Sequence, residues 1–454
     1  MTARRVAVVG GGLAGLTTAL RCADAGYAVA LFESRPRLGG LTHSFRREGL
    51  WIDNGQHVFL RCCTSYLGLL ARLGVADRVT VQDRLDVPVR SELDTRSARL
   101  RRTALPAPLH LGSALARYRW LRPAARARVM RAALALGRVD RMDPEVDRWS
   151  FGDWLTEHGQ DARAIETVWD LIGIATLNAP AERASLALAA TVFQIGLLDS
   201  SAAADIGWSL VPLQELHGDA AARALAAAGV TVHTRCKVRD LVPTAEGWTV
   251  RGGGVDEMVD AVVLAVPPSA AEALVPPEAI ELAPGWAAGL GSTPIVNLHV
   301  VYDRVVLDEP FVAAVDSPLQ WVFDRTRQAG LTQGQYLAAS LSAADDIVDA
   351  PVSALRDRFL PHLERLLRTT SETRVLEFFV TRERQATFRQ RPGTVGLRPS
   401  ARTALPGLYL AGAWTDTGWP ATMEGAVRSG EAAVAALVDR TPADRPSGRR
   451  EAVV

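Results

Sequence analysis

The sequence has almost no lysine. Of its 51 basic residues, Lys237 is the only lysine, and all the others are arginines. Any mechanism that needs a lysine amine therefore has a single candidate. Fifty acidic residues balance the basic ones and leave a net charge of +1. Proteins that bind nucleic acid neutralise its phosphates with a surplus of positive charge, so we do not expect nucleic acid as a partner.

Cysteines and long apolar runs are also scarce. The four cysteines show neither a CxxC pair nor zinc-finger spacing: Cys22, Cys62, Cys63 and Cys236. We therefore expect no metal site and, because no signal-peptide pattern opens the chain, a reducing cytoplasmic setting. No apolar run approaches the roughly 20 residues that cross a bilayer, which leaves contact with the inner face of the membrane open. The 454 residues, 48% of them hydrophobic, suffice for two domains with their own cores.

The first 33 residues contain a complete strand, helix and strand unit. Residues 4–9 form an apolar run, a glycine-rich turn follows, residues 16–25 favour a helix, and residues 27–33 form a second apolar run that ends in Glu33. Gly10 permits the tight turn, Gly12 lets the backbone approach a pyrophosphate, and Gly15 lets helix and strand pack closely. The N-terminus of the helix then faces the phosphates with its unpaired N–H groups, and Glu33 can accept hydrogen bonds from a ribose.

An arginine-rich segment spans residues 99–141, where eleven arginines accompany one acid, Asp140. Residues 124–137 are amphipathic at helical spacing, with an apolar side expected from Val129, Met130, Ala133, Leu134 and Leu136. One interpretation is a helical subdomain with a solvated arginine face. The other is a basic apolar surface that rests on anionic lipid. Both stay open.

The remaining pattern predicts mixed structure. Helices continue to about residue 200 and carry Trp149, Trp154 and Trp169, which we expect in the core. Residues 230–266 predict strands with a hairpin turn at 252–254, where no helix follows the glycines, so we find no nicotinamide site. Further segments favour an antiparallel sheet and its neighbours: strands at 294–302, 311–316, 320–324 and 335–341, a helix at 352–368, a buried strand at 408–412 and a helix at 422–438.

Several motifs together resemble the superfamily of flavin oxidoreductases that contains amine oxidases, carotenoid desaturases and the related Rab GDP-dissociation inhibitors. They are the glycine motif with Glu33, the sequence RLGG at 37–40, and the closing strand and helix. Within that superfamily the chain is most similar to the hydroxysqualene dehydroxylases, also called squalene-associated FAD-dependent desaturases. The stretches that carry this likeness are 53–57, 294–297, 316–324, 386–388 and, above all, 414–430.

The resemblance implies an α/β fold of the amine oxidase type, in which a Rossmann-type FAD-binding domain is interleaved with a substrate domain. The FAD domain would comprise residues 1–90, 206–270 and 401–438. The substrate domain, an antiparallel sheet plus helices with a membrane-facing part, would comprise 91–205 and 271–400. Residues 439–454 are expected to form a disordered tail.

The resemblance also implies non-covalent FAD and the residues that bind it: Gly10, Gly12, Leu13, Ala14, Gly15, Glu33, Ser34, Arg37, Gly39, Gly40, Val238, Gly412, Asp416, Thr422, Met423 and Glu424. One departure concerns the residue after Gly412. Most members place an acid there, whereas this chain has Ala413. Asp416 or a water would substitute, or FAD would be held less tightly.

The implied reaction replaces the allylic hydroxyl of hydroxysqualene with hydrogen, which needs an acid for the leaving water and a hydride from reduced FAD. Catalytic candidates are Asp53, Gln56 and His57. The ordinary pKa of histidine suits proton donation near neutrality, although His57 could equally brace a loop. Second candidates are Asp316, Gln320 and Asp324, with strand-end turns as their alternative role. A long isoprenoid would need an apolar tunnel, for which the candidates are Trp321, Phe323, Phe378, Phe379 and Trp419.

Three other functions compete with this one. A carotenoid desaturase also handles long polyenes but runs in the opposite redox direction. An amine oxidase that reacts with oxygen often uses a lysine near the flavin, and Lys237 falls in the region expected to hold the adenosine half. A non-catalytic prenyl-binding protein would lack an intact flavin site. The electron donor that reduces FAD is left unknown by the sequence.

Overall fold

The structure, a computed structural model, describes residues 3–439, so the predicted tail lies outside the described residues except for Asp439. A parallel sheet of five strands forms one half of the molecule, in the order β10-β2-β1-β14-β20. Its strands are β1 (Arg5–Val9), β2 (Ala28–Phe32), β10 (Thr231–His233), β14 (Ala261–Leu264) and β20 (Leu408–Leu410). This strand order and direction confirm the predicted Rossmann-type domain.

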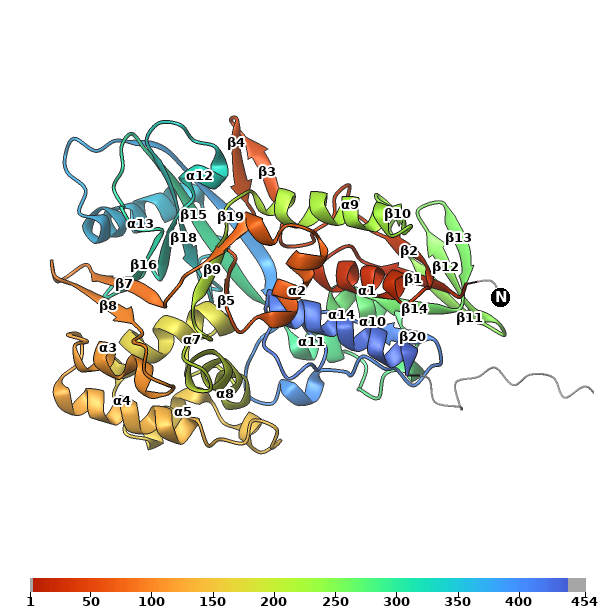
Figure 1. The fold of residues 1–454 in the computed structure, drawn as a ribbon, viewed down its shortest axis with the longest axis horizontal. Helices are drawn as coiled ribbons and strands as arrows, with labels where there is room; N and C mark the ends of the chain where they lie inside the picture. Colours follow the sequence, from red (N-terminus) through yellow and green to blue (C-terminus); the bar gives the residue numbers. More distant parts are fainter. Residues whose placement is uncertain (1–2, 440–454) are drawn as a thin grey trace, which may run out of the picture.

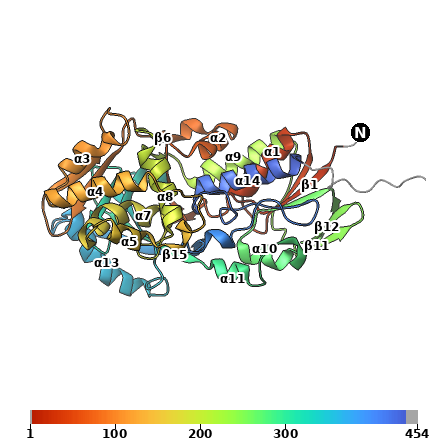
Figure 2. The same ribbon diagram turned by 90° about the horizontal axis from the view of Figure 1, so that it is seen from below.

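Helices cover both faces of the parallel sheet, as Figures 1 and 2 show. Val6 and Val8 of β1 pack with α1 (Leu13–Asp24) and α14 (Met423–Val438). Ala7 and Val9 point the other way, into the core that contains residues of α10 (Pro268–Leu274) and α11 (Trp286–Leu290). Successive side chains of a strand point to opposite faces, which explains why these strands are apolar at every position.

A seven-stranded sheet forms the other half, in the order β19-β15-β18-β17-β16-β7-β8. Its strands are β7 (Asp86–Ser91), β8 (Ser97–Arg101), β15 (Thr293–Tyr302), β16 (Phe311–Val315), β17 (Trp321–Asp324), β18 (Gln335–Leu341) and β19 (Val375–Thr387). All neighbours are antiparallel except β16 and β7. The four predicted strands between 294 and 341 are confirmed, as is the helix at 352–368, observed as α13 (Val352–Leu367) across one sheet face.

A helical lobe lies at the end of the molecule opposite the N-terminus (Figure 1). Its helices are α3 (Gly112–Ala116), α4 (Pro123–Leu136), α5 (Phe151–Glu157), α6 (Ala162–Ala164), α7 (Asp170–Leu177) and α8 (Leu186–Phe193). Trp154 and Trp169 are buried as expected, whereas Trp149 is exposed. The buried face of α4 consists of Ala125, Val129, Ala132 and Leu136. The prediction that Leu134 belongs to the apolar side is wrong, because this residue faces outward.

Smaller elements connect these bodies. They are β3 (Ser44–Arg47) with β4 (Leu50–Asp53); β5 (Val58–Leu60), β9 (Ile206–Ser209) and β6 (Val79–Val81); β11 (Asp240–Thr244), β12 (Gly247–Gly252) and β13 (Val255–Val259); and the helices α2 (Thr64–Arg72), α9 (Ala220–Ala227) and α12 (Thr326–Ala329). The predicted hairpin at 252–254 joins β12 to β13. No helix among residues 3–439 is long and apolar enough to cross a membrane.

Two predicted domain boundaries need correction, and the division itself stays a prediction. Strand β7 belongs to the seven-stranded sheet, so the substrate side begins near residue 86 rather than 91. Helices α10 and α11 belong with the parallel sheet, since the Trp286 ring lies 5.3 Å from that of Trp414 and the Ala404 N–H donates to the Ala279 carbonyl at 2.9 Å. The sequence run 271–290 therefore packs with the parallel sheet, in the half that is predicted to bind FAD.

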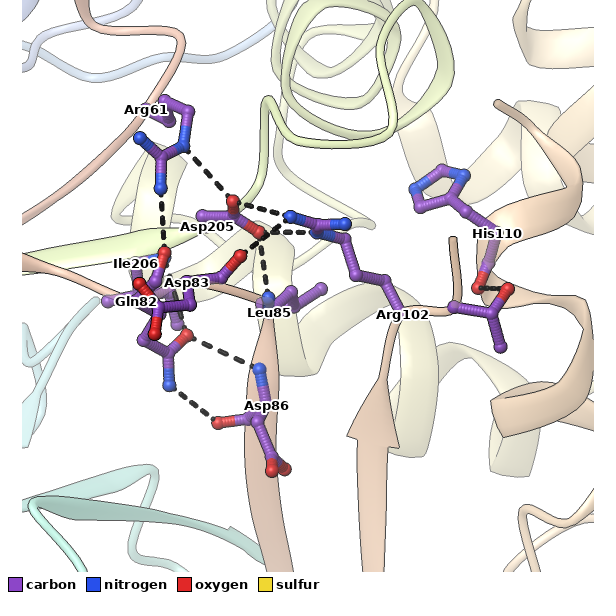
Figure 3. Close-up of polar contacts among 10 residues, drawn as sticks. Arg61, Gln82, Asp83, Leu85, Asp86, Arg102, His110, Asp205 and Ile206 are labelled. Carbon is purple, nitrogen blue, oxygen red and sulfur yellow. Dashed lines mark hydrogen bonds and ion pairs between the residues drawn. The ribbon is translucent and has the colours of Figure 1, made fainter. Parts of the chain in front are cut away.

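Asp205 connects three parts of the chain at the junction of the two halves (Figure 3). Its fully buried carboxylate accepts hydrogen bonds from Arg61 Nε (3.0 Å), Arg102 Nε (2.6 Å) and the Leu85 N–H (2.7 Å). Burial alone would raise the pKa of Asp205, but the bonds from Arg102 and Arg61 hold this pKa below its usual range. The carboxylate thus stays charged and joins β5, β8 and β9.

We predict that Asp205→Asn lowers the free energy of unfolding by about 3 kcal/mol, because the largely buried Arg102 and the partly exposed Arg61 both lose the charge that they pair with. The wild type should lose the same contribution as the pH falls below about 4, where an unfolded aspartate takes up a proton. Urea unfolding followed by tryptophan fluorescence measures both effects. Asp94→Asn is the control, since its partner Arg96 is largely exposed. Equal unfolding midpoints for Asp205→Asn and the control would contradict the prediction.

Candidate functional site

The first part of the site is the start of α1. Gly12 is its N-cap without a side-chain hydrogen bond, and the first turn contains no acid. Within the described chain the N–H groups of Leu13 and Ala14 have no acceptor. A Cβ at Gly15 would lie 1.9 Å from the Gly10 carbonyl oxygen, so helix and strand pack more closely than any side chain allows. Unpaired N–H groups at the positive end of a helix form an anion site.

The RLGG loop lies directly on this helix start. Gly40 has φ +58°, and a Cβ there would lie 2.9 Å from Gly12 Cα. The Gly39 N–H donates to the Gly11 carbonyl at 2.8 Å. Arg37 Nη2 lies 2.7 Å from His43 Nε2, while its Nε is buried without a partner in the described residues. The loop therefore brings a partly buried arginine and two glycines to the anion site.

Glu33 lies at the end of the site that is predicted to hold a ribose. Its carboxylate accepts hydrogen bonds from the N–H groups of Gly11 and Arg35, both at 2.7 Å, and from Ser34 Oγ at 3.2 Å. The Cys236 N–H donates to the Glu33 carbonyl at 2.9 Å, which brings the loop containing the buried Val238 beside it. The sequence-predicted residues of the nucleotide end are thus gathered at one edge of the parallel sheet.

The closing helix α14 supplies a second helix start with unpaired N–H groups. Thr422 is the N-cap, and its side chain accepts a hydrogen bond from the Gly425 N–H at 3.1 Å. The N–H groups of Met423 and Glu424 have no acceptor in the described chain. The carboxylate of Glu424 is used elsewhere: it accepts from the N–H groups of Ser65 (3.2 Å) and Tyr66 (2.7 Å). Only the backbone of Glu424 is therefore free for a ligand, while its side chain caps α2.

Arg398 lies beside Ala413, where the expected acid is missing. The predicted substitute, Asp416, is exposed, and its Oδ1 accepts from the Gly418 N–H at 3.3 Å. The buried guanidinium of Arg398 instead donates to the carbonyls of Ala413 (3.3 Å) and Thr415 (2.5 Å). Burial lowers the pKa of Arg398 to about 10, against the opposing effect of nearby carboxylates. Sequence reasoning missed this residue, because nothing in the motif signals a buried arginine.

Asp53 forms a buried ion pair with Arg325 across the two halves of the molecule. Its other oxygen accepts from Ser44 Oγ at 2.6 Å and from the Leu213 N–H at 3.0 Å. Both oxygens are therefore occupied, which suits a group that positions the following residues better than a proton donor. Gln56, by contrast, has a buried Nε2 without a partner in the described residues.

Burial lowers the pKa of His57 to about 4, with smaller effects from Asp53 in the opposite direction and from Arg325. The expectation of a proton donor near neutrality rested on the ordinary pKa and does not fit this environment. Nearby His217 behaves alike: burial lowers its pKa to about 3, and its Nε2 bonds Tyr66 Oη at 2.8 Å. At pH 7 both imidazoles are neutral and can donate only a hydrogen bond.

The second set of acid candidates has structural partners. Asp316 forms an ion pair with Arg163 and accepts from Ser91 Oγ. Gln320 bonds the backbone of Ser342, and Asp324 accepts from the N–H of Thr326 and from Gln335 Nε2. These contacts fit the alternative role at turns and strand ends.

One face of the seven-stranded sheet carries two different surfaces. Polar residues cluster at its β15 and β19 edge: Asn297, His299, Tyr336 and Thr381. Aromatic residues follow toward β16, where the rings of Phe311, Trp321 and Phe323 lie about 6 Å from one another. The opposite face packs on α13 and includes Phe378 at its margin, so this tunnel candidate points away.

The other two tunnel candidates pair with cations or rings. Phe379 stacks on His299 at 4.6 Å and lies under Arg47, and Trp419 lies under Arg428 at 4.5 Å. This face of the seven-stranded sheet thus combines an apolar area with a compact polar cluster.

Comparisons with known proteins agree with this geometry. Residues 13–438 match the family described as flavin containing amine oxidoreductase. The chain is 29% identical over 439 residues to a hydroxysqualene dehydroxylase of Rhodopseudomonas palustris, covering 95% of this chain and 97% of the relative. It is 25% identical over 484 residues to a protein of Synechococcus elongatus named probable zeta-carotene desaturase, covering 96% and 98%. The solved structure of putrescine oxidase bound to putrescine has a TM-score of 0.70 at 20% identity, covering 97% and 100%, which shows a shared fold.

The residues at the sheet edge fit FAD. Two helix starts offer unpaired N–H groups, the glycine backbones leave no room for side chains, and Arg37 holds a buried donor without a partner in the described residues. Arg37 and the N–H groups of α1 would hold the pyrophosphate, and Glu33 the ribose.

We predict that Gly40→Ala weakens FAD binding at least tenfold, because the new Cβ would push the RLGG loop off Gly12. The measurement is a titration of the FAD-free protein by quenching of flavin fluorescence. Gly26→Ala is the matched control: it has φ +82° and open space around the new Cβ, so it carries the backbone strain without the clash. Equal affinities of the two variants for FAD would refute the predicted role of the loop.

Proposed function

This chain belongs to the flavin-containing amine oxidoreductase family and is an FAD-dependent oxidoreductase, and from that premise we propose that it reduces hydroxysqualene to squalene. The observation that carries the proposal is the similarity to a hydroxysqualene dehydroxylase along 95% of the chain. The sheet face supports it, because an apolar strip for a hydrocarbon lies beside a polar cluster for one hydroxyl.

The reaction breaks the allylic C–O bond, adds a proton to the leaving hydroxyl to form water, and adds a hydride to the carbon. Fully reduced FAD would supply the hydride when it is bound and, in the overall balance, also the proton that leaves with the hydroxyl as water. The aromatic strip holds the chain and excludes water, which protects an allylic cation from recapture. His57 and Gln56 offer neutral N–H donors to the leaving oxygen, and the Asp53–Arg325 pair fixes the segment that carries them.

A desaturase is the second candidate, because the similarity to the Synechococcus elongatus protein is almost as high. Polyene hydrocarbons offer no partner for the buried Asn297 Oδ1, which has none among the described residues, so this sheet face favours a substrate with a hydroxyl. An amine oxidase that uses lysine is disfavoured, since Lys237 belongs to the loop beside Glu33, on the adenosine side.

The proposed reaction is tested without oxygen. The FAD-loaded enzyme is reduced with one equivalent of dithionite, hydroxysqualene is added, and the oxidised-flavin absorbance is followed while squalene is extracted. We expect one squalene for each flavin reoxidised. A flavin that stays reduced with hydroxysqualene, or that is reduced from the oxidised state by a carotene, would overturn the proposal in favour of desaturation.

The helical lobe is the part we propose for membrane contact. Five exposed arginines there have no ion-pair partner among the described residues: Arg117, Arg119, Arg122, Arg131 and Arg138. Six exposed apolar side chains accompany them: Leu93, Leu105, Leu109, Leu134, Met142 and Trp149. Helices α3 and α4 and the hairpin of β7 and β8 share one end of the molecule in Figures 1 and 2. Cationic and apolar groups together favour an anionic lipid surface.

We expect the triple variant Arg117→Gln, Arg119→Gln, Arg122→Gln to bind phosphatidylglycerol vesicles roughly 100-fold more weakly, at about 1 kcal/mol per lost charge. Co-sedimentation measures the affinity. The matched control removes three exposed arginines elsewhere, Arg4, Arg223 and Arg356, and should bind like the wild type. Equal weakening in both triple variants would mean a general charge effect and would contradict this docking surface.

A further inference from the structure

Asn297 is a fully buried residue in the middle of β15 with one unsatisfied atom. Its Nδ2 donates to the Asn54 carbonyl and to Thr381 Oγ1, both at 3.4 Å. Its Oδ1 is buried and has no partner among the described residues. Leaving a buried acceptor unpaired costs free energy, so such an atom points to a ligand that completes it.

The neighbouring hydrogen bonds fix which end of the amide is the oxygen. Burial lowers the pKa of His299 to about 3, so its ring is neutral and has one donor and one acceptor. Thr381 Oγ1 donates to the Asn54 carbonyl at 3.3 Å, which leaves His299 Nε2 to donate to Thr381 at 2.9 Å. His299 Nδ1 then accepts from Tyr336 Oη at 2.7 Å. A flipped Asn297 amide would face its oxygen toward the Asn54 carbonyl, acceptor against acceptor.

A matching donor lies on the segment that Asn297 holds. Asn54 accepts the bond from Asn297, and two residues later Gln56 has its buried, unpartnered Nε2. A Cβ at the intervening Gly55 would lie 4.0 Å from Asn297 Nδ2, so this segment runs against the residue. One acceptor and one donor without partners are the complement of a hydroxyl, which has one hydrogen and two lone pairs.

We propose that Asn297 Oδ1 accepts a hydrogen bond from the hydroxyl of the substrate, and that Gln56 Nε2 donates one to the same oxygen. The inference rests on the proposed function and deepens it, because it names the residues that distinguish an isoprenoid alcohol from a hydrocarbon. A site built to bond a hydroxyl rejects the analogue without it, since its own polar atoms would stay unpaired. Asn297 is thus a specificity residue and Gln56 its partner.

The test compares two ligands that differ by the hydroxyl. The enzyme with oxidised FAD, which cannot turn over hydroxysqualene, is titrated in detergent micelles with hydroxysqualene and with squalene, using the flavin absorbance change. We expect the wild type to bind hydroxysqualene at least tenfold more tightly. Asn297→Leu, of similar size, should remove that difference while its affinity for squalene stays as in the wild type. Gln56→Met should reduce the difference in the same selective way.

Thr381→Val is the matched control. It removes the hydrogen bond from Thr381 to the Asn54 carbonyl and one of the two acceptors of Asn297 Nδ2, but the bond from Asn297 Nδ2 to the Asn54 carbonyl still orients the amide, so the variant should keep the preference for hydroxysqualene. If Asn297→Leu keeps that preference, or if Thr381→Val loses it equally, Asn297 only supports the loop and the inference falls. If the wild type binds hydroxysqualene no better than squalene, the inference also falls. A wild type that reduces hydroxysqualene nonetheless would leave the proposed function standing, which separates the two failures.

Discussion

The buried ion pair of Asp53 and Arg325 is the contact on which the arrangement of the two halves depends. Asp53 ends β4 beside the flavin side, and Arg325 follows β17 of the other sheet. The Arg325 N–H donates to the Tyr336 carbonyl, and Tyr336 leads through His299 and Thr381 to Asn54, the residue after Asp53. The contacts therefore form a closed ring that joins Asp53 and Asn54 to the seven-stranded sheet. A buried pair of this kind contributes more to a unique geometry than to net stability.

The local features of the fold were predictable, and the long-range ones were not. The glycine motif with its strands, the strands at 294–341 and the closing helix are encoded by neighbouring residues, and the structure confirms them. Strand β19 escaped prediction because it is a charged edge strand without clear alternation. The parallel pairing of β7 with β16 escaped because it joins segments more than 200 residues apart. Hydrophobic periodicity predicts single strands and helices, but it does not predict which distant strands pair.

The candidate site shows the same division. Glycines and Glu33 were found because a backbone approach needs particular residues at fixed spacing. The role of Arg398, the partners of Asp53 and the unpaired Asn297 oxygen depend on residues distant in the chain. The lowered pKa of His57 follows from burial, which the motif does not reveal. Because His57 and His299 are neutral and Asp53 is paired with Arg325, these groups carry no unpaired charge, as suits a hydrocarbon.

The unpaired oxygen of Asn297 also bears on how a catalytic cycle ends. In the proposed reaction the hydroxyl leaves as water, and the squalene formed has no group that bonds Asn297 or Gln56. Water or an incoming alcohol then satisfies these atoms better than the product does. In that reaction the chemical step itself weakens binding to its product and favours release of the thirty-carbon hydrocarbon.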